Sequence, residues 1–540
     1  MAGGSGAAAA ARRANEAAQI DVFEAGHHIS FANCGLPYYL SGEIASREKL
    51  LVTSAELMKR RFNVDVHIRH AATGIDRATK TLRVRNLDTF EEIDHAYDRL
   101  IIATGARGFR PPTPGLEHPR MNECRTIDDI DALMAHVTEH SKGRALVIGG
   151  GFIGVEVAEA LTNRGLVVIL VDLAPQVLPP LDPEMAAAAA ERLERHGVTL
   201  KLGAKIEKIE HQRDVSYAVL SDGGRIAFDF GVISIGVTPE TSLAKEAGLE
   251  IGATGGLVVN EQQQTSDPDI FAAGDVTELL YWPTETRMRI ALAGPANKQA
   301  RVAGANAALQ SERLRTSGAA GTSIVRLFDL AVGMTGLSEK AAIAKKIPHQ
   351  IIYTQNGHHA GYFPGAKPLF IKLVFSTETG RVLGGQIFGE EGVDKRIDVL
   401  AVAIQAGFTV DQLADADRAY APPFGSAKDP IVIAGMVASN AWHGRTVTIT
   451  PQELAKELSS SSPPVVIDVR AEGEHGAGGI KGAINVPIDS LRKEGLNIQK
   501  DHPIVVHGAV GYRGYVAERM LRQSGYANVR NLSGGYRAGN

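Results

Sequence analysis

The sequence predicts an α/β protein with several domains. Its 540 residues exceed the roughly 100–200 residues of a typical domain. Apolar residues make up 44% and charged residues 22% of the chain, which is typical of folded globular proteins. Several short apolar runs end in glycine-rich turns that lead into helix-like segments. This order of strand, turn and helix predicts parallel sheets covered by helices.

Charge and cysteine content narrow the functional classes. The formal net charge of −4, without a large basic excess in either half, argues against nucleic-acid binding. The longest apolar stretch, 145–161, is glycine-rich and interrupted by Glu156, so no membrane span is predicted. The only cysteines, Cys34 and Cys124, are far apart and show no CxxC spacing. This excludes a disulfide framework and indicates a reducing, cytoplasmic compartment.

Residues 144–165 predict a dinucleotide-binding Rossmann unit. An apolar strand leads into a GxGxxG turn and an amphipathic helix, and a second apolar run ends in an acid. The glycines allow a tight turn, close approach to a pyrophosphate and close helix–strand packing, while the acid accepts hydrogen bonds from the ribose. No arginine follows at 173–176 to hold a 2′-phosphate, so NADH is favoured over NADPH. The predicted NAD-binding residues are Gly149, Gly151, Gly154 and Asp172.

A second unit of this kind is predicted at the N-terminus. Residues 2–13 have the pattern of a glycine loop and helix, and 19–24 that of a strand ending in Glu24. The chain begins inside the loop, so the strand before it is missing from the sequence. Residues 97–106 predict a strand and tight turn, and 265–276 a strand that leads through Gly274 and Asp275 into a helix-like segment. Two nucleotide sites predict one cofactor for each.

These segments resemble the two-dinucleotide-binding flavoprotein disulfide reductases. The match rests on ATG at 103–105 and AAGD at 272–275. The resemblance implies an FAD-binding domain split around an NAD domain, with Glu24 on the FAD ribose and Asp275 on the ribityl chain. The FAD-binding residues it implies are Gly3, Gly4, Glu24, Thr104, Gly105, Gly274 and Asp275, and it adds Gly236 to the NAD site.

Within that superfamily, SFANCGLPYY at 30–39 resembles the coenzyme A-disulfide reductases, which use one active-site cysteine. The resemblance implies that Cys34 is this cysteine and that Cys124 is structural. Tyr362 and Tyr420 match two catalytic tyrosines contributed by the C-terminal dimerisation domain, which implies a homodimer. The substrate contacts it implies are Arg13, Ser30, Asn33 and Lys428.

The activity implied is FAD-dependent, NAD(P)H-driven reduction of CoA disulfide, or of a CoA or other low-molecular-weight persulfide, through Cys34. Because the thiolate is the nucleophile, its surroundings are expected to lower its pKa, with oxidised flavin and the helix start after Cys34 as the sources. One alternative is an NADH oxidase or peroxidase that cycles Cys34 through a sulfenic acid. Another is an impaired flavoprotein that acts as a binding protein.

The C-terminal residues resemble a rhodanese domain, on the evidence of GAINVPIDSLR, HGAVGYRGY and NLSGGYR. Gly508 stands where that family has its sulfur-carrying cysteine, and Gly479 where it has a histidine. We therefore expect a folded module without sulfurtransferase activity. Relative to the family, a strand and part of a loop are expected before Met1, which a GUG codon read as a start would explain. The module also stops early, at Asn540.

The resulting fold prediction is α/β, with two dinucleotide-binding (Rossmann-like) domains, an α+β dimerisation domain and a rhodanese-like α/β domain. The predicted boundaries are 1–110 and 256–312 for the two parts of the FAD domain, 111–255 for the NAD(P) domain, 320–440 for dimerisation and 446–540 for the rhodanese-like domain.

Overall fold

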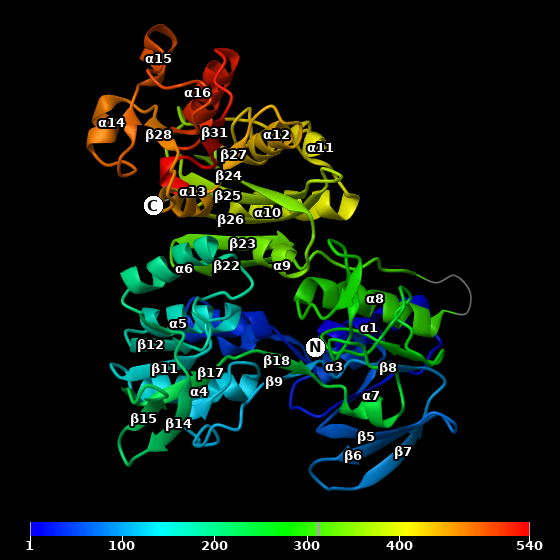
Figure 1. The fold of residues 1–540 in the computed structure, drawn as a ribbon. Coiled ribbons are helices and arrows are strands. Elements are labelled where there is room, and N and C mark those ends of the chain that lie inside the picture. Colours follow the sequence, from blue (N-terminus) through cyan, green and yellow to red (C-terminus); the bar gives the residue numbers. More distant parts are fainter. Residues whose placement is uncertain (1, 310–313, 539–540) are drawn as a thin grey trace. The chain divides into compact units, whose positions relative to one another are not determined.

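The computed structural model describes residues 2–309 and 314–538, and the chain forms two compact units, Met1–Gly321 and Thr322–Asn540 (Figure 1). The expectations about Met1 and Asn540 therefore concern residues outside the described part. No helix within the described ranges has both the length and the apolar character needed to cross a bilayer.

The NAD-side domain of the first unit is a five-stranded parallel sheet with a continuous apolar core. The strand order is β10 (Met121–Asn122), β17 (Phe230–Ile233), β11 (Arg144–Ile148), β12 (Val167–Asp172) and β13 (Thr199–Leu202). An antiparallel sheet shares the core on one face: β14 (Ile206–His211), β15 (Ser216–Leu220) and β16 (Arg225–Phe228). Its helices are α4 (Ile127–Glu139), α5 (Phe152–Asn163) and α6 (Pro183–Arg195). The predicted strand–loop–helix–strand unit is confirmed here.

The flavin-side domain has two separate parallel strand pairs. One joins β1 (Asp21–Glu24) to β4 (Asp65–Ile68), and the other joins β8 (Leu100–Ile102) to β19 (Ile270–Ala272). The helix α1 (Ala2–Ala14) packs along α8 (Ala293–Ala308) so closely that a Cβ on Gly304 would lie 2.0 Å from the Ala7 carbonyl oxygen. This domain also contains a three-stranded antiparallel meander of β5 (His70–Asp76), β6 (Thr81–Asn86) and β7 (Glu92–Ala96).

Two local predictions in this domain are wrong. Residues 2–13 were expected to start as a loop, but the whole segment lies in α1, because packing on α8 outweighs the low helix propensity of glycine. The predicted helix-like segment after Asp275 is a turn. Gly274 has a φ of +88°, and the backbone of Glu278 then bonds to Leu257, which draws the chain into an extended path.

The shorter elements of the first unit connect these sheets. The helices are α2 (Leu36–Ser41), α3 (Ala55–Phe62) and α7 (Ser242–Glu246). The strand pairs are β2 (Ser30–Phe31) with β3 (Leu51–Thr53), β9 (Ala106–Gly108) with β18 (Val237–Pro239), and β20 (Leu279–Tyr281) with β21 (Thr286–Met288).

The second unit contains an antiparallel sheet and a parallel sheet. The antiparallel order is β22 (Ser323–Leu327), β23 (Leu330–Gly336), β26 (Val382–Gly389), β25 (Pro368–Ser376) and β24 (His349–Gly357), with α9 (Glu339–Ala344), α10 (Val393–Ala406), α11 (Val410–Ala414) and α12 (Pro430–Trp442). The parallel order is β27 (Thr448–Ile449), β31 (Val529–Leu532), β30 (Ile504–His507), β28 (Val465–Asp468) and β29 (Ile484–Asn485), with α13 (Pro451–Leu458), α14 (Glu472–Gly476), α15 (Ile488–Glu494) and α16 (Tyr512–Gln523). The fold class is as predicted.

Candidate active site

Cys34 lies in the short helical turn Asn33–Gly35, between β2 and α2. The residue is exposed, and its backbone N–H donates to Oδ1 of Asn33 at 3.0 Å. The thiol also donates to that oxygen, with 3.6 Å between Sγ and Oδ1. The Asn33 side chain, which was predicted to bind substrate, thus positions the cysteine.

The chain's own groups raise the pKa of the Cys34 thiol. Partial burial is the largest cause, followed by the negative charges of Glu156 and Asp275, and a backbone hydrogen bond opposes them. The expected lowering is therefore wrong for the polypeptide alone, since α2 has only six residues and two acids lie nearby. Any lowering has to come from groups that bind to the chain.

Glu156 belongs to the surroundings of Cys34, although it was not predicted as a site residue. It lies on α5, the helix after the GxGxxG turn, and its carboxylate accepts a hydrogen bond from the Tyr38 hydroxyl on α2 at 3.2 Å. Arg164, at the end of α5, donates to the Leu40 carbonyl oxygen at 2.6 Å. These bonds hold α5 against α2. The signal in the sequence was the acid that interrupts the apolar stretch 145–161.

The FAD-side glycines bring the start of α1 against the turn after β19. A Cβ on Gly3 would lie 2.9 Å from the Ala273 carbonyl oxygen, and Gly274 has a φ of +88°. Gly3 lies in the first turn of the 13-residue α1, and the N-terminal amides of a helix suit a phosphate. Burial raises the pKa of Asp275 above its ordinary value, although nearby cations oppose this. The close backbone approach and the half-buried acid fit an extended phosphate-containing cofactor.

The other predicted FAD-side residues have simpler surroundings. Around Gly4, a Cβ would meet only the Ala103 side chain, at 3.6 Å. Glu24 ends β1 and accepts the Gly26 N–H at 2.7 Å. Thr104 donates its hydroxyl to the Glu240 carbonyl oxygen at 2.6 Å, and Gly105 has a φ of +70°. Thr104 and Gly105 thus lie where the flavin-side and NAD-side segments meet.

The GxGxxG turn shows the close packing that its spacing predicts. A Cβ on Gly154 would lie 1.8 Å from the Gly149 carbonyl oxygen, whereas Gly151 faces open space at the start of α5. Gly236, with a φ of +98°, also faces open space. The Asp172 carboxylate accepts the backbone N–H groups of Gly150 at 2.5 Å and Ala174 at 2.7 Å. These bonds place the Asp172 carboxylate beside the glycine turn.

Tyr362 and Tyr420 form a pair in the second unit. Their hydroxyl oxygens are 2.7 Å apart, and the residues are 75% and 47% exposed. This hydrogen bond raises the pKa of Tyr362 above its ordinary value. Lys428, in the segment before α12, is exposed. Tyrosines 58 positions apart in sequence thus present adjacent hydroxyls at the surface of this unit.

The remaining predicted substrate contacts lie in the first unit. Ser30 is buried in β2, and Arg13 is exposed in the last turn of α1. The neighbouring Arg12 is buried and donates to the carbonyl oxygens of Phe62 and Asn63. Of these two arginines, only Arg13 is therefore available to a ligand.

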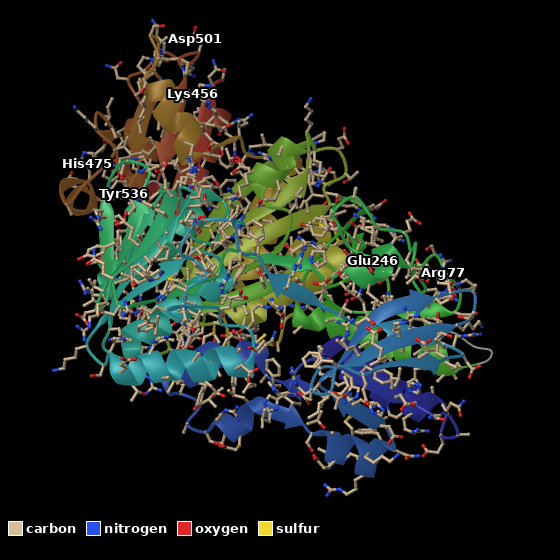
Figure 2. All side chains as sticks on the ribbon, turned by 90° about the horizontal axis from the view of Figure 1, so that it is seen from below. Arg77, Glu246, Lys456, His475, Asp501 and Tyr536 are labelled. Atoms are coloured by element: carbon tan, nitrogen blue, oxygen red, sulfur yellow. The ribbon has the colours of Figure 1, made fainter. Side chains whose placement is uncertain are left out.

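The rhodanese-like module keeps a polar framework beside Gly508. Asp468 is fully buried and accepts hydrogen bonds from Arg470 at 2.6 Å and from His475 at 2.8 Å. Figure 2 shows His475 and Tyr536 in the same part of the module, and the Arg470 guanidinium lies 4.2 Å from the Tyr536 ring centroid.

Two glycines of the module, Gly508 and Gly479, stand where the rhodanese family has a cysteine and a histidine. A larger side chain at either position would crowd neighbouring groups. A Cβ on Gly508, directly after β30, would lie 2.9 Å from the Cβ of Arg513. At Gly479, a Cβ would lie 3.2 Å from His475 Nδ1. A glycine also carries no sulfur, so the position after β30 cannot hold a persulfide.

Comparison with known families accounts for most of the chain. Residues 2–300 match the pyridine nucleotide-disulphide oxidoreductases, 322–430 the dimerisation domain of those enzymes, and 450–540 the rhodanese-like domain. The chain belongs to the pyridine nucleotide-disulphide oxidoreductase family. It is an oxidoreductase, and the family fold implies FAD and NAD(P)H as cofactors.

Two curated relatives from archaea cover most of the chain. The NAD(P)H sulfur oxidoreductase (CoA-dependent) of Pyrococcus furiosus is 35% identical over 81% of this chain and 97% of its own. The NADH oxidase of Methanocaldococcus jannaschii is 34% identical over 78% of this chain and 93% of its own.

Two solved structures match nearly the full length. Reduced Bacillus anthracis CoADR-RHD has a TM-score of 0.95 and 42% identity, and the match covers 99% of this chain and 96% of that one. An NAD-dependent persulfide reductase from A. fulgidus has a TM-score of 0.91 and 35% identity, and the match covers 99% and 97%. The predicted combination of reductase and rhodanese-like domains is confirmed by the family matches at 2–300 and 450–540.

Proposed function

We propose that this protein uses NAD(P)H to reduce CoA disulfide, or a CoA or other low-molecular-weight persulfide, through Cys34. The observation that carries the proposal is a single exposed thiol at the start of α2. Cys124 is buried, and mainly for this reason its pKa rises to about 12. It is therefore unsuited to act as a second reactive thiol. A lone reactive cysteine favours a mixed disulfide with a small thiol over an internal disulfide.

Cofactor binding is assigned to the glycine-rich ends of the two nucleotide domains. For FAD, the residues proposed are Gly3, Gly4, Glu24, Thr104, Gly105, Gly274 and Asp275. For NADH, with NADPH as the alternative, they are Gly149, Gly151, Gly154, Asp172 and Gly236. When bound, the flavin would supply the redox chemistry by which two electrons from NAD(P)H reach the sulfur.

The chain supplies the nucleophile and a proton. The Cys34 thiolate attacks one sulfur of the substrate, forms a mixed disulfide and releases the other sulfur as a thiolate or sulfide. Two electrons and a proton then return the mixed disulfide to the Cys34 thiolate and a free thiol. The Tyr362–Tyr420 hydroxyl pair is the proposed proton donor to the leaving sulfur, and the direct hydrogen bond between them supports proton transfer.

Substrate contacts are proposed at Arg13, Ser30, Asn33 and Lys428. The two cations would pair with the phosphates of CoA. We also propose a homodimer in which the exposed tyrosines reach a partner's site, because the match to the dimerisation domain includes them. Both cysteines are free, which supports the cytoplasm as the compartment.

Substrate turnover on one flavin-loaded preparation tests the proposal. NADH oxidation is followed with CoA disulfide, CoA persulfide, hydrogen peroxide and oxygen, for the wild type and for Cys34→Ser. Fast disulfide or persulfide turnover that Cys34→Ser abolishes, with the flavin spectrum retained, is the expected result. Turnover that survives in Cys34→Ser would show that Cys34 is not the nucleophile.

A second candidate function is oxidation of NADH by oxygen or peroxide. The similarity to an NADH oxidase favours it, as does an exposed thiol that can form a sulfenic acid. Fast peroxide or oxygen turnover without disulfide turnover would establish this activity. A preparation without flavin absorbance would instead favour a binding protein.

A further inference from the structure

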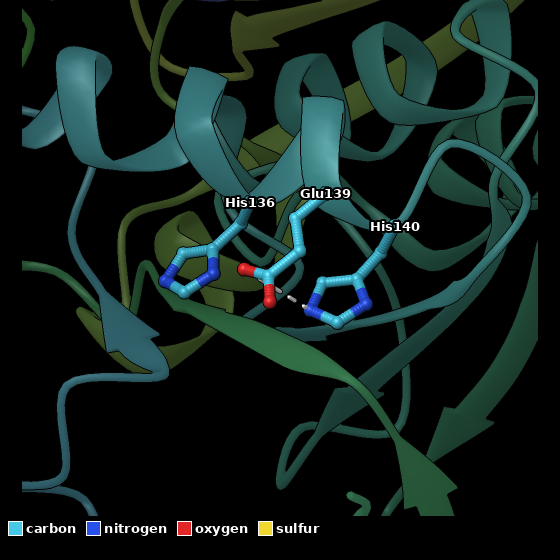
Figure 3. A group of neighbouring side chains, drawn as sticks. All are labelled: His136, Glu139 and His140. Atoms are coloured by element: carbon cyan, nitrogen blue, oxygen red, sulfur yellow. Dashed lines mark ion pairs between the residues drawn. The ribbon is translucent and has the colours of Figure 1, made fainter.

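Three metal-ligating side chains gather at the C-terminal end of α4, in the NAD-side domain. His136, Glu139 and His140 each offer a donor atom, and these atoms lie within 4.8 Å of one another. Figure 3 shows the Glu139 carboxylate between the two imidazole rings. Residues four apart lie on one face of a helix, so the two histidines point the same way. None of these residues belongs to the proposed reductase site.

Both imidazole rings lie roughly parallel to the ring of Phe230. The His136 ring stacks on Phe230 with the centroids 5.3 Å apart and the planes at 9°, and the His140 ring lies 6.2 Å away at 22°. Phe230 is fully buried in β17. Because this packing restricts the rings, binding an ion costs less side-chain entropy than at two freely exposed histidines.

His136 has the hydrogen-bond pattern of a metal ligand. Its Nε2 donates to the Pro119 carbonyl oxygen at 3.4 Å, which leaves Nδ1 with a lone pair in the neutral ring. This Nδ1 is buried and finds no hydrogen-bond partner within residues 2–309 and 314–538. In Figure 3 the ring nitrogen nearer the Glu139 carboxylate is the one next to the attached ring carbon, which is Nδ1. Metal-bound histidines commonly donate their other N–H to a carbonyl in this way.

The charges around the cluster also favour a cation. His140 caps α4, where the helix dipole is negative, and its Nε2 is 3.8 Å from a Glu139 carboxylate oxygen. The nearby Asp229 carboxylate is paired with Arg144, at 2.9 Å to the guanidinium and 2.7 Å to the backbone N–H. Arg144 is thereby neutralised, and Asp229 is not counted as a ligand.

We propose that His136, Glu139 and His140 bind a divalent transition-metal ion of the Zn²⁺ class. Two imidazoles and a carboxylate suit Zn²⁺, Ni²⁺ or Cu²⁺, whereas Mg²⁺ and Ca²⁺ prefer oxygen ligands. Ligands of one Zn²⁺ lie about 2.0–2.2 Å from it, so the donors have to move closer together than 4.8 Å. The Glu139 side chain is 71% exposed and free to swing inward, with water as the fourth ligand.

Calorimetric titration of the flavin-loaded full chain with Zn²⁺ alone tests this site. All arms carry Cys34→Ser, so that the active-site thiol does not bind the metal. The expected result is one Zn²⁺ per chain, with affinity reduced at least about tenfold by His140→Ala and by Glu139→Gln. Excess Mg²⁺ should leave the titration unchanged. A metal-binding deficit of this kind is independent of whether the reductase proposal holds.

A matched control is His196→Ala, which removes an exposed histidine at the end of α6 in the same domain. It should bind Zn²⁺ as tightly as the parent. Unaltered flavin absorbance and melting temperature without metal would show that each variant is folded. Equal Zn²⁺ affinity in the parent and in the His136→Ala/His140→Ala double variant would overturn the proposal, as would a bound-zinc anomalous signal elsewhere.

Discussion

At the residue scale, partial burial and two nearby acids raise the pKa of the Cys34 thiol. Glu156 from α5 and Asp275 from the flavin-side turn both add negative potential at the thiol. A nucleophile among carboxylates is poorly ionised until a bound group or a higher pH offsets them. Together with burial, the two acids therefore favour the thiol over the thiolate in the polypeptide alone.

Glu156→Gln should lower the pKa of Cys34, since it removes one negative charge and keeps the size of the side chain. The pH profile of Cys34 alkylation by iodoacetamide, measured on the flavin-loaded enzyme, would then shift to lower pH. Tyr38→Phe is the matched control, because it removes the hydrogen bond to Glu156 and keeps the charge. An unchanged or upward-shifted midpoint in Glu156→Gln would contradict the prediction.

In the rhodanese-like module, the buried Asp468 carboxylate links the pH to the stability of the fold. Burial raises its pKa, but hydrogen bonds from Arg470 and His475 outweigh burial and lower the pKa to about 2. A carboxyl with a lowered folded-state pKa stabilises the fold fully above its unfolded value of about 4. That contribution is lost as the pH falls from about 4 to about 2.

Asp468→Asn should destabilise the module by about 3–5 kcal/mol at neutral pH, because it leaves the buried Arg470 charge without its partner. Denaturant unfolding of the full chain, monitored by hydrogen exchange of the amides in β28 and β30, measures this loss of stability. The variant should also lose less stability than the wild type between pH 4 and 2. The exposed Asp489→Asn is the control, with an expected change within about 0.5 kcal/mol. Equal stability of Asp468→Asn and wild type would contradict the argument.

At the scale of elements, the sequence predicted those whose pattern is local. The Rossmann unit of 144–172 formed as expected, since strand periodicity and glycine spacing are properties of neighbouring residues. The start of α1 and the turn after Asp275 were mispredicted because distant partners, α8 and Leu257, decide them. The hydrogen bond between Tyr38 and Glu156 joins residues 118 positions apart and could not be predicted from the sequence. The sequence showed only that Glu156 interrupts the apolar stretch 145–161.

Two glycines of the GxGxxG motif have different expected roles: Gly154 in close backbone packing and Gly151 in leaving space for the ligand. At Gly154 an added methyl group would meet the Gly149 backbone, so Gly154→Ala should lower the melting temperature and weaken NADH binding together. Gly151 has an ordinary φ of −71° and open space around it. Gly151→Ala should therefore keep the melting temperature and raise KM for NADH, because the methyl group occupies the approach of the pyrophosphate. Melting curves and NADH saturation kinetics on both variants distinguish the two effects. Loss of stability in Gly151→Ala would show that this position serves packing.

At the scale of the whole molecule, the proposed reaction needs residues from both compact units. Cys34 lies in the first unit and the Tyr362–Tyr420 pair in the second. The tyrosines are exposed on a domain that matches a dimerisation domain, which supports their action in a partner's site. The family resemblance of the sequence motifs predicted a catalytic role for Cys34, Tyr362 and Tyr420. The motifs could not show which chains share a site, because that depends on assembly.

Mixed dimers test this shared site. Cys34→Ser subunits and Tyr362→Phe/Tyr420→Phe subunits should each be inactive or strongly impaired as homodimers. A C₂ dimer that contains one of each has one site with both defects and one intact site, if the tyrosines act across the interface. Co-expressed, differently tagged chains purified as mixed dimers should then regain about half of the wild-type kcat. If the tyrosines served the cysteine of their own chain, both sites would carry a defect, and the mixed dimers would stay as impaired as their parents. Flavin content and equal subunit ratio, checked on the same preparations, ensure that the comparison reports the position of the tyrosines rather than a loss of folding.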